Sequence, residues 1–499
     1  MSVQATVGIA QGEGAMGLFT VEELREVISV KVLAGQDTLT GKRRIRQIST
    51  DSRSIRRGDL FIALRGDRFD GHEFVPTVLA QGAVGAIVHD EYHLPPRSAA
   101  VRRIEGPSAP FLFGVRDPLF AYQQLATHYR SRFTIPMVAV TGSNGKTTTK
   151  DMVAAVLAQR WSVLKTEGNF NNRIGVPSTL FRLTARHQAA VIEMGVDQQG
   201  QTTRLCEIVR PTIGLITNIG PDHLEFFGSM EGSAQAKAEL LDMLPADGMA
   251  ILNADDTYFD YLAARAQCRV MSFGLSEMAD VRASGIMSDA RQGTTFRLHL
   301  PGKSRPTIVR IKVHGTHNVT NALAAAAVGA SLNLSGSMIA QGLGRFRPAA
   351  MRSQVVTHHG VHIINDCYNA NPASMKAALQ LLAQWSPARE RIAVLGDMLE
   401  LGSEAARMHR NVGEFLAAQG LSRLIVCGTL GRELGEGARQ GGMAGSQIDE
   451  VVDAAAAADR LKRIVRQGDV VLVKGSRGMK MEQVVQVLTG MRAVTRRAS

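Results

Sequence analysis

The segment best suited to chemistry is the loop of residues 142–147, with the sequence GSNGKT. An apolar run precedes it and a helical pattern follows, so backbone N–H groups and a helix N-terminus should face an anion there. In such loops the lysine, here Lys146, reaches nucleotide phosphates, and the next hydroxyl, Thr147, binds Mg²⁺. Val140 stands where the general pattern GxxxxGK[ST] has its first glycine. We predict an ATP or GTP site. Its residues are Thr141, Gly142, Ser143, Asn144, Gly145, Lys146, Thr147 and Thr148.

Three further residues are candidates for holding a metal ion or a carboxylate. Glu193 ends the apolar run 189–192, and the carboxyl end of a parallel strand faces the usual ligand crevice. Its oxygens suit Mg²⁺, although a surface carboxylate is the alternative. His223 follows another apolar run and Lys237 lies in a helical pattern. Taken alone, the first reads as a hydrogen-bonded loop histidine and the second as a solvated helix lysine.

The elements that must position these groups alternate between apolar runs and helical periodicity, which implies βαβ units and parallel sheets. Strands are predicted at residues 61–64, 85–89, 137–140, 189–192, 213–217, 361–365, 392–395, 424–427 and 470–473. Helices are predicted at residues 21–32 and 122–130, after the loop to residue 159, and at the alanine-rich 318–330. The pattern breaks near residues 135 and 347, so we predict α/β domains at 18–134, 135–346 and 347–499. Residues 1–17 are expected to fray.

Composition limits the class of protein. The chain has 499 residues, of which 45% are hydrophobic and 20% charged, which excludes wholesale disorder and suits about three domains. No apolar run reaches the ~18–20 residues of a membrane helix, and no secretory signal is recognisable. The four cysteines are scattered, which fits a reducing cytoplasm. The net charge of +12 suits either nucleic acid or anionic small ligands such as nucleotides.

In combination, the motifs resemble those of the Mur ligase family of ATP-dependent amide-forming enzymes. The loop TGSNGKTTTK at 141–150 matches that family's phosphate loop, including the missing first glycine. The resemblance continues in order through GNFNN at 168–172, IGVP at 174–177, EMG at 193–195, the segment 218–223, KAE at 237–239 and GTHNVTNA at 315–322.

Two later segments resemble one branch of the Mur ligase family in particular. DCYNANPASM at 366–375 and LGDMLELG at 395–402 are similar to the branch that adds D-alanyl-D-alanine to UDP-N-acetylmuramoyl-tripeptide, and the DNPR segment of the diaminopimelate-adding branch is absent. Residues 50–53 and 58–64 resemble the N-terminal domain of these branches. The resemblance implies a UDP-sugar-binding N-terminal α/β domain, a central P-loop ATPase domain with a parallel sheet, and a Rossmann-like C-terminal domain.

The resemblance also implies roles for individual residues. Lys146, His223 and Lys237 would be catalytic, with Lys237 carbamylated so that it supplies oxygen ligands. Two Mg²⁺ ions would be held by Thr147, Glu193, His223 and Lys237. ATP would also contact Asn318, Asn321, Arg352 and Asp366. Substrate contacts would come from Ser49, Asp51, Ser52, Arg53, Asn169, Asn171, Asn369, Asn371 and Ser374.

The implied reaction activates the tripeptide carboxylate as an acyl phosphate, which the D-alanyl-D-alanine amine then attacks. The domains should close to exclude water. We expect a cytoplasmic monomer that binds neither nucleic acid nor a membrane, and the third peptide residue stays open between diaminopimelate and lysine. The alternatives are another amide ligase of the superfamily, such as a folylpolyglutamate or cyanophycin synthetase, a nucleic-acid-stimulated P-loop ATPase, and an inactive nucleotide-binding scaffold.

Overall fold

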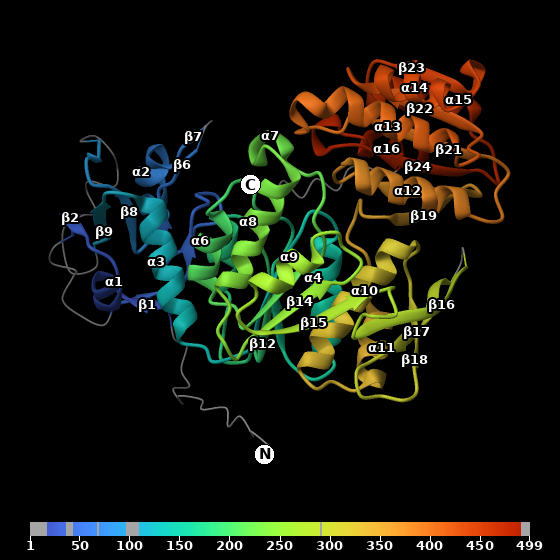
Figure 1. The fold of residues 1–499 in the computed structure, drawn as a ribbon. Helices are drawn as coiled ribbons and strands as arrows, with labels where there is room; N and C mark the ends of the chain where they lie inside the picture. Colours follow the sequence, from blue (N-terminus) through green and yellow to red (C-terminus); the bar gives the residue numbers. More distant parts are fainter. Residues whose placement is uncertain (1–16, 36–42, 67–68, 96–108, 290–291, 491–499) are drawn as a thin grey trace.

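The computed structural model describes residues 17–35, 43–66, 69–95, 109–289 and 292–490. Three α/β units follow one another along the chain, each built on its own sheet (Figure 1). The predicted fold class is therefore confirmed. Apart from Gly17, the segment expected to fray lies outside the described residues. Within the described ranges, no helix combines the length and the apolar character needed to cross a membrane.

The N-terminal unit has a five-stranded sheet in the order β2-β9-β8-β5-β4. Its strands are β2 (Lys31–Ala34), β4 (Ile48–Ser49), β5 (Leu60–Ile62), β8 (Gly85–His89) and β9 (Phe111–Val115). Two small ribbons pair β1 (Phe19–Thr20) with β3 (Arg44–Ile45) and β6 (Arg65–Gly66) with β7 (Phe69–Asp70). The helices are α1 (Val21–Val27), α2 (Val75–Ala80) and α3 (Pro118–Ser131).

The helix predicted at residues 21–32 is wrong in its second half. α1 begins at a reciprocal cap between Thr20 and Glu23 but ends at Val27, and Ile28 is already extended, with φ −125°. From Val27 onward the chain is rich in β-branched residues, which favour extended backbone over helix. This stretch therefore leads into β2, which pairs antiparallel with β9.

The central unit has a nine-stranded sheet in the order β11-β12-β10-β13-β14-β15-β16-β17-β18. Pairing is parallel from β11 to β16 and antiparallel from β16 to β18. The strands are β10 (Met137–Thr141), β11 (Val163–Lys165), β12 (Ala189–Glu193), β13 (Ile213–Ile216), β14 (Met249–Asn253), β15 (Arg269–Gly274), β16 (Val281–Asp289), β17 (Gly293–His299) and β18 (Thr307–Ile311). The helices are α4 (Lys146–Leu157), α5 (Gly175–Leu180), α6 (Gln201–Val209), α7 (Leu224–Phe227), α8 (Met230–Asp242), α9 (Phe259–Arg265), α10 (Thr316–Ser331) and α11 (Gly336–Arg345).

The alanine-rich helix α10 packs directly against α4, the helix that follows the phosphate loop. The residues from Ala322 to Val328 are all buried, and their small side chains permit a close approach. A Cβ added at Gly329 would come within 2.8 Å of Val156 on α4, so that crossing point requires glycine. This packing carries Asn321 of α10 to the phosphate loop.

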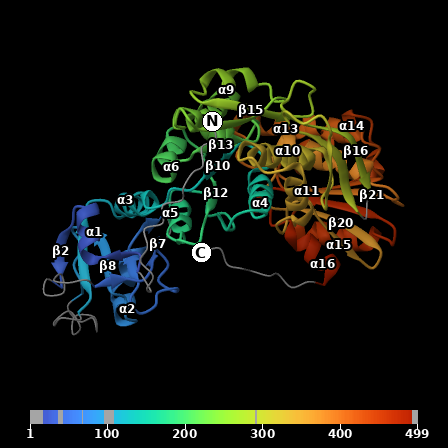
Figure 2. The ribbon, with the colours of Figure 1, turned by 90° about the horizontal axis from the view of Figure 1, so that it is seen from below.

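The C-terminal unit has a six-stranded sheet in the order β19-β20-β24-β21-β22-β23, parallel except for β19. Figure 2 shows this unit beside the central one, on the side away from the N-terminal unit. Its strands are β19 (Gln354–His358), β20 (Val361–Asp366), β21 (Arg391–Gly396), β22 (Arg423–Cys427), β23 (Ile448–Val451) and β24 (Val470–Lys474). The helices are α12 (Pro372–Gln384), α13 (Ala405–Ala417), α14 (Gly431–Gln440), α15 (Ala454–Ile464) and α16 (Glu482–Thr489). The four strands predicted here are all present, each longer by one or two residues.

Helix α3 of the N-terminal unit packs against the central unit and forms hydrogen bonds with it. The Tyr129 hydroxyl donates a hydrogen bond to the Leu183 carbonyl at 2.7 Å, and Arg130 Nε donates to the Val209 carbonyl at 2.7 Å. The apolar cluster around α3 also continues into the central unit, from Leu125 to Met137 and Leu180. The two units therefore share one apolar core.

Candidate active site

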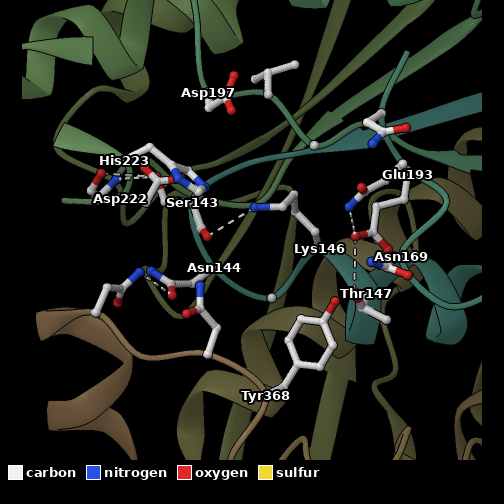
Figure 3. Close-up of a pocket in the computed structure, with 18 of the residues that line it drawn as sticks. Ser143, Asn144, Lys146, Thr147, Asn169, Glu193, Asp197, Asp222, His223 and Tyr368 are labelled. Atoms are coloured by element: carbon white, nitrogen blue, oxygen red, sulfur yellow. Dashed lines mark hydrogen bonds between the residues drawn. The ribbon is translucent and has the colours of Figure 1, made fainter. Parts of the chain in front are cut away.

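A cavity of about 1390 Å³ lies where the three units meet, and we call it the central cavity. Its wall includes part of α3, the phosphate loop at 142–147 and a segment of the C-terminal unit (Figure 3). The predicted residues that line it are Ser143, Asn144, Gly145, Lys146, Thr147, Thr148, Asn169, Asn171, Glu193, His223, Asn318, Asn321, Arg352, Asp366, Asn369, Asn371 and Ser374.

The remaining predicted residues lie outside that wall. Thr141 and Gly142 are continuous with the phosphate loop, and buried Lys237 contacts the lining residue Asp222. Ser49, Asp51, Ser52 and Arg53 sit at and after the end of β4 in the N-terminal unit, where Arg53 Nε pairs with Asp51 at 2.8 Å.

The phosphate loop joins β10 to α4 in a conformation that glycine permits. Gly142 and Gly145 have φ of +135° and +81°, which other residues rarely adopt. The Thr217 hydroxyl donates to the Asn144 carbonyl at 2.6 Å, and the Asn144 N–H donates to the Asn218 side chain at 3.0 Å. No side chain caps the start of α4, so its first N–H groups can receive an anion.

Replacing Gly145 by alanine tests this geometry. The new Cβ would lie 2.4 Å from Asn321 Oδ1, whereas the same change at Gly200, also a helix N-cap with φ +80°, meets nothing within 4 Å. Both variants should lose about 1–2 kcal/mol of unfolding free energy to backbone strain. Gly145→Ala should lose about 1–3 kcal/mol more through the clash and bind ATP more weakly. Denaturant unfolding and nucleotide titration measure both effects, and equal losses for the two variants would contradict the account.

Lys146 is the first residue of α4, and its side chain turns back over the loop. Nζ donates to the Gly142 carbonyl at 2.6 Å and to the Ser143 carbonyl at 3.2 Å (Figure 3). The ammonium therefore lies at the loop whose backbone N–H groups would hold phosphate, where a positive charge stabilises the γ-phosphoryl group.

Glu193 is the last residue of β12 and is buried, so the surface-carboxylate interpretation is wrong. Its Oε1 accepts hydrogen bonds from the Thr147 hydroxyl at 3.1 Å and from Asn171 Nδ2 at 2.9 Å. Oε2 accepts no hydrogen bond and lies 3.4 Å from the ammonium of Lys150, which is itself buried. Sequence reasoning missed Lys150, although it lies one helical turn after Lys146.

This oxygen pair fits a magnesium ion. A hydroxyl and a buried carboxylate with an unused oxygen are hard ligands of the kind that Mg²⁺ prefers. In the part of the chain that is described, no group of three or more histidine, cysteine or acidic side chains could hold a metal by itself. Nucleotide phosphates and water would have to complete the coordination, which is usual for Mg²⁺ at phosphate-binding sites.

A buried polar cluster lies directly behind the phosphate loop. Lys237 is only 1% exposed, so the interpretation as a solvated helix lysine is wrong. Its Nζ donates to the Ser233 hydroxyl at 2.7 Å and to Asp222 Oδ1 at 3.1 Å, and lies 4.7 Å from the Phe227 ring centre. Asp222 Oδ1 also accepts from the Ser143 hydroxyl at 2.5 Å, so Asp222 links Lys237 to the loop.

Charge and burial set the pKa values in this cluster. Burial lowers the pKa of Lys237 to about 8, an effect that the Asp222 charge opposes and the Lys146 charge reinforces. Burial alone would raise the pKa of Asp222, but the charges of Lys237 and Lys146 and the Ser143 hydrogen bond outweigh it and lower that pKa. With a pKa of about 8, a minor share of Lys237 is neutral at pH 7, far more than for an unshifted lysine.

His223 lies beside Asp222 on the cavity wall (Figure 3). Its backbone is left-handed, with φ +50°, and it precedes α7. Its Nδ1 is 2.6 Å from Oε2 of Glu400, which belongs to the C-terminal unit. Nδ1 makes no hydrogen bond in the described residues, so the prediction of a hydrogen-bonded loop histidine is not borne out at this nitrogen. The role of His223 as a metal ligand stays a prediction.

The C-terminal unit contributes the ion pair of Lys474 and Asp366 to the cavity wall. Lys474, at the end of β24, donates to Asp366 at 2.6 Å and to the Asn369 carbonyl at 2.9 Å. Burial would raise the pKa of Asp366, but the Lys474 charge outweighs it and lowers that pKa. Arg352 stacks on Tyr368, its guanidinium 3.9 Å from the ring centre. Sequence reasoning missed Lys474, although it ends a buried strand just as Glu193 does.

Asn371 connects the C-terminal unit to the phosphate loop. Its Nδ2 donates to Asn144 Oδ1 at 2.9 Å, and its Oδ1 accepts from the Ser374 N–H at 2.9 Å as the N-cap of α12. The Ser374 hydroxyl in turn accepts from the Asn371 N–H at 3.0 Å. Both side chains predicted to contact substrate thus also fix the start of α12 against the loop.

Comparison with known proteins gives a consistent result along the chain. Models described as "Mur ligase family, catalytic domain", "Mur ligase middle domain" and "Mur ligase, glutamate ligase domain" match residues 44–119, 140–329 and 351–477. The UDP-N-acetylmuramoyl-tripeptide–D-alanyl-D-alanine ligase of Bacillus subtilis is 36% identical over 445 residues, which cover 89% of this chain and 93% of that protein.

Two crystal structures are similar over most of their length. MurF from Acinetobacter baumannii superposes with a TM-score of 0.81 at 32% identity, covering 93% of this chain and 100% of that one. MurF ligase from Thermotoga maritima in complex with ADP superposes with a TM-score of 0.77 at 26% identity, covering 89% and 97%.

Proposed function

Because the chain belongs to the Mur ligase family, we propose that it joins D-alanyl-D-alanine to UDP-N-acetylmuramoyl-tripeptide with ATP, in peptidoglycan precursor synthesis. One observation carries the proposal: a phosphate loop and the buried Thr147–Glu193 pair face a cavity walled by all three units. Such a site can bring a nucleotide, an acid and an amine together. The names of the similar proteins select the acid and the amine among the reactions of the family.

Each of the three predicted domains is proposed to bind a different part of the substrates. We assign the UDP-sugar to residues 18–134, with contacts from Ser49, Asp51, Ser52 and Arg53. ATP belongs to residues 135–346, completed by Arg352 and Asp366 from residues 347–499. The peptide would run along the cavity from α3 toward Asn169 and Asn171, and the dipeptide would bind near Asn369, Asn371 and Ser374.

In the first step, two anions that repel each other must come together: the γ-phosphate of ATP and the tripeptide carboxylate. Side chains and backbone groups of the chain can offset this repulsion. The phosphate-loop N–H groups and Lys146 would bind the β- and γ-phosphates and stabilise charge on the moving phosphoryl group. Transfer to the tripeptide carboxylate gives an acyl phosphate, which the dipeptide amine attacks as phosphate leaves. The contact of Asn371 with Asn144 ties the amine-binding region to this loop and helps to exclude water.

We infer sites for two Mg²⁺ ions, which supply charge neutralisation between the phosphate and carboxylate oxygens. Thr147 and Glu193 would hold the first. His223 and a carbamate on Lys237 would hold the second. Carbamylation needs a neutral amine to attack CO₂, and a lysine with a pKa of about 8 provides one. The resulting carbamate would turn a cation that repels Mg²⁺ into an oxygen ligand.

The lowered pKa of Lys237 predicts how carbamylation depends on pH. With a pKa of about 8, about one molecule in ten has a neutral Lys237 at pH 7 and about half at pH 8. At fixed dissolved CO₂, the rate at which CO₂-stripped enzyme regains activity should rise nearly tenfold per pH unit below pH 7, about fivefold from pH 7 to 8, and level off near pH 9. An unshifted lysine would keep accelerating to about pH 10. Carbon-13 NMR with labelled CO₂ measures the rate of carbamate formation directly. A rate that keeps rising to pH 10 would contradict the claim that burial lowers the pKa of Lys237.

The enzyme would act in the cytoplasm as a monomer, without nucleic acid. Its net charge of +12 favours encounter with ATP and the UDP-linked peptide, which are both strongly anionic.

Phosphate release from ATP tests the proposal. Purified protein with Mg²⁺ and UDP-N-acetylmuramoyl-tripeptide should release phosphate only when D-alanyl-D-alanine is added, and the product should gain the mass of the dipeptide. Glutamate and aspartate serve as alternative amines, and RNA and DNA as alternative activators. Turnover with glutamate or aspartate would favour another ligase of the family, and stimulation by nucleic acid would favour a P-loop ATPase. Tripeptides ending in diaminopimelate or lysine establish the third residue.

A further inference from the structure

The loop that follows β21 in the C-terminal unit reaches across to the start of α7 in the central unit. α7 projects toward the C-terminal unit (Figure 1), and the Glu225 N–H faces the Glu400 carbonyl at 3.4 Å. The Glu400 carboxylate lies against His223, with Oε2 2.6 Å from Nδ1. In the described ranges, no other ion pair or side-chain hydrogen bond of this carboxylate is found.

Both residues of this contact have an unfavourable backbone. His223 has φ +50° and Glu400 has φ +64°, in the left-handed region that residues with a Cβ rarely occupy. Two strained residues from different units that face each other across a cavity wall indicate a site maintained for function rather than for stability. An ion pair with a half-exposed carboxylate adds little to the stability of the fold.

The short distance between His223 Nδ1 and Glu400 Oε2 bears on where the imidazole carries its proton. A nitrogen lone pair 2.6 Å from a carboxylate oxygen would be repelled, so this contact favours the tautomer with hydrogen on Nδ1. Nδ1 has no hydrogen-bond partner among the described residues, so the contact with Oε2 is a close electrostatic pair rather than a hydrogen bond. A neutral His223 in this pair keeps its lone pair on Nε2, the nitrogen that remains for a metal ion.

We propose that Glu400 is a positioning residue for His223: it fixes the Nδ1–H tautomer and the ring orientation, and so prepares Nε2 to bind the second divalent cation. Carboxylates that orient metal-binding histidines in this way are common partners of metal sites. Because Glu400 belongs to the C-terminal unit, the second cation site is complete only while that unit is docked. This inference rests on the role proposed above for His223.

Three variants separate positioning from a structural role. Glu400→Ala removes the carboxylate, and Glu400→Gln keeps an oxygen acceptor without the charge. Glu404→Gln is the matched control, because Glu404 lies four residues away in the same unit and, among the described residues, its ion pair is with Arg407 on its own segment. All three should unfold at nearly the wild-type temperature, since the Glu400 and Glu404 side chains are 48% and 43% exposed and ion pairs at such positions contribute little.

The first measurement is nitrogen-15 NMR of histidine-labelled enzyme, with the His223 signal identified by its loss in His223→Gln. The wild type and Glu404→Gln should show the Nδ1–H tautomer of His223. Glu400→Ala should shift the population toward Nε2–H, and Glu400→Gln should lie between. An unchanged tautomer in Glu400→Ala would overturn the proposal, whatever reaction the enzyme catalyses.

The second measurement counts Mn²⁺ binding by electron paramagnetic resonance, with a non-hydrolysable ATP analogue and the UDP-linked tripeptide present. One of two Mn²⁺ sites should weaken about tenfold in Glu400→Ala and less in Glu400→Gln, with Glu404→Gln unchanged. A changed tautomer with unchanged Mn²⁺ affinity would overturn the metal part of the proposal. If the wild type binds ligands but forms no product, the proposed function fails, while the tautomer result still decides the role of Glu400.

Discussion

Replacing Lys237 by alanine is expected to lower kcat for ligation by about a thousandfold, because it removes the side-chain nitrogen that would carry the proposed carbamate at the second cation site. Lys237 is buried behind the phosphate loop and contacts Asp222, which lines the central cavity. The exposed Lys312 provides a control, and Lys312→Ala should keep near wild-type activity. Phosphate release with both substrates present is the measurement.

The loss in Lys237→Ala could also arise from destabilisation, because it leaves the buried Asp222 without its cationic partner. Chemical rescue separates the two causes. Acetate or propionate should restore part of the activity, because a short carboxylate fits the space vacated by the lysine and replaces the carbamate oxygens. Neither acid can repair a misfolded chain. Near wild-type activity in the variant, or a lower kcat that no acid raises while the fold is intact, would refute the carbamate role.

The strands could be predicted where an apolar run was uninterrupted and flanked by turns. β10 and β24 are buried on both faces, and the sequence marks them clearly. The end of α1 could not be predicted from periodicity, because the spacing of Ile28 and Val32 fits one face of a helix as well as a strand. The pairing of Val32 with Phe113 of β9, more than 75 residues away in the chain, decides between the two.

The candidate site was predictable as a set of residues but not as an arrangement. The phosphate loop is local in sequence, so its motif alone places Lys146 and Thr147. The burial of Glu193, the link from Ser143 through Asp222 to Lys237, and the pairing of Asp366 with Lys474 all join residues far apart in the chain. Such contacts depend on how the units pack, and no spacing rule within one segment contains that information.

Replacing Lys146 by alanine is the second change with a large expected effect, and it tests the phosphate loop rather than the metal sites. Nζ lies against the Gly142 and Ser143 carbonyls, at the loop that would hold the γ-phosphate. Its positive charge should count more in the transition state than in bound ATP, because negative charge is redistributed on the moving phosphoryl group. We therefore expect kcat to fall about a thousandfold and the affinity for ATP to fall much less.

A control lysine lies in the same unit, at the end of strand β11. Lys165 ends β11 and pairs with Asp151 at 2.7 Å, but its side chain is 44% exposed and it is absent from the cavity wall. Lys165→Ala should leave kcat within about twofold of the wild type, since Lys165 is outside the cavity wall and Asp151 keeps the Lys150 ammonium at 3.7 Å. Single-turnover phosphate release and titration with a fluorescent ATP analogue separate chemistry from binding. An equal loss in kcat and in affinity for Lys146→Ala would mean that the lysine serves only to hold ATP, and the transition-state role would have to be abandoned.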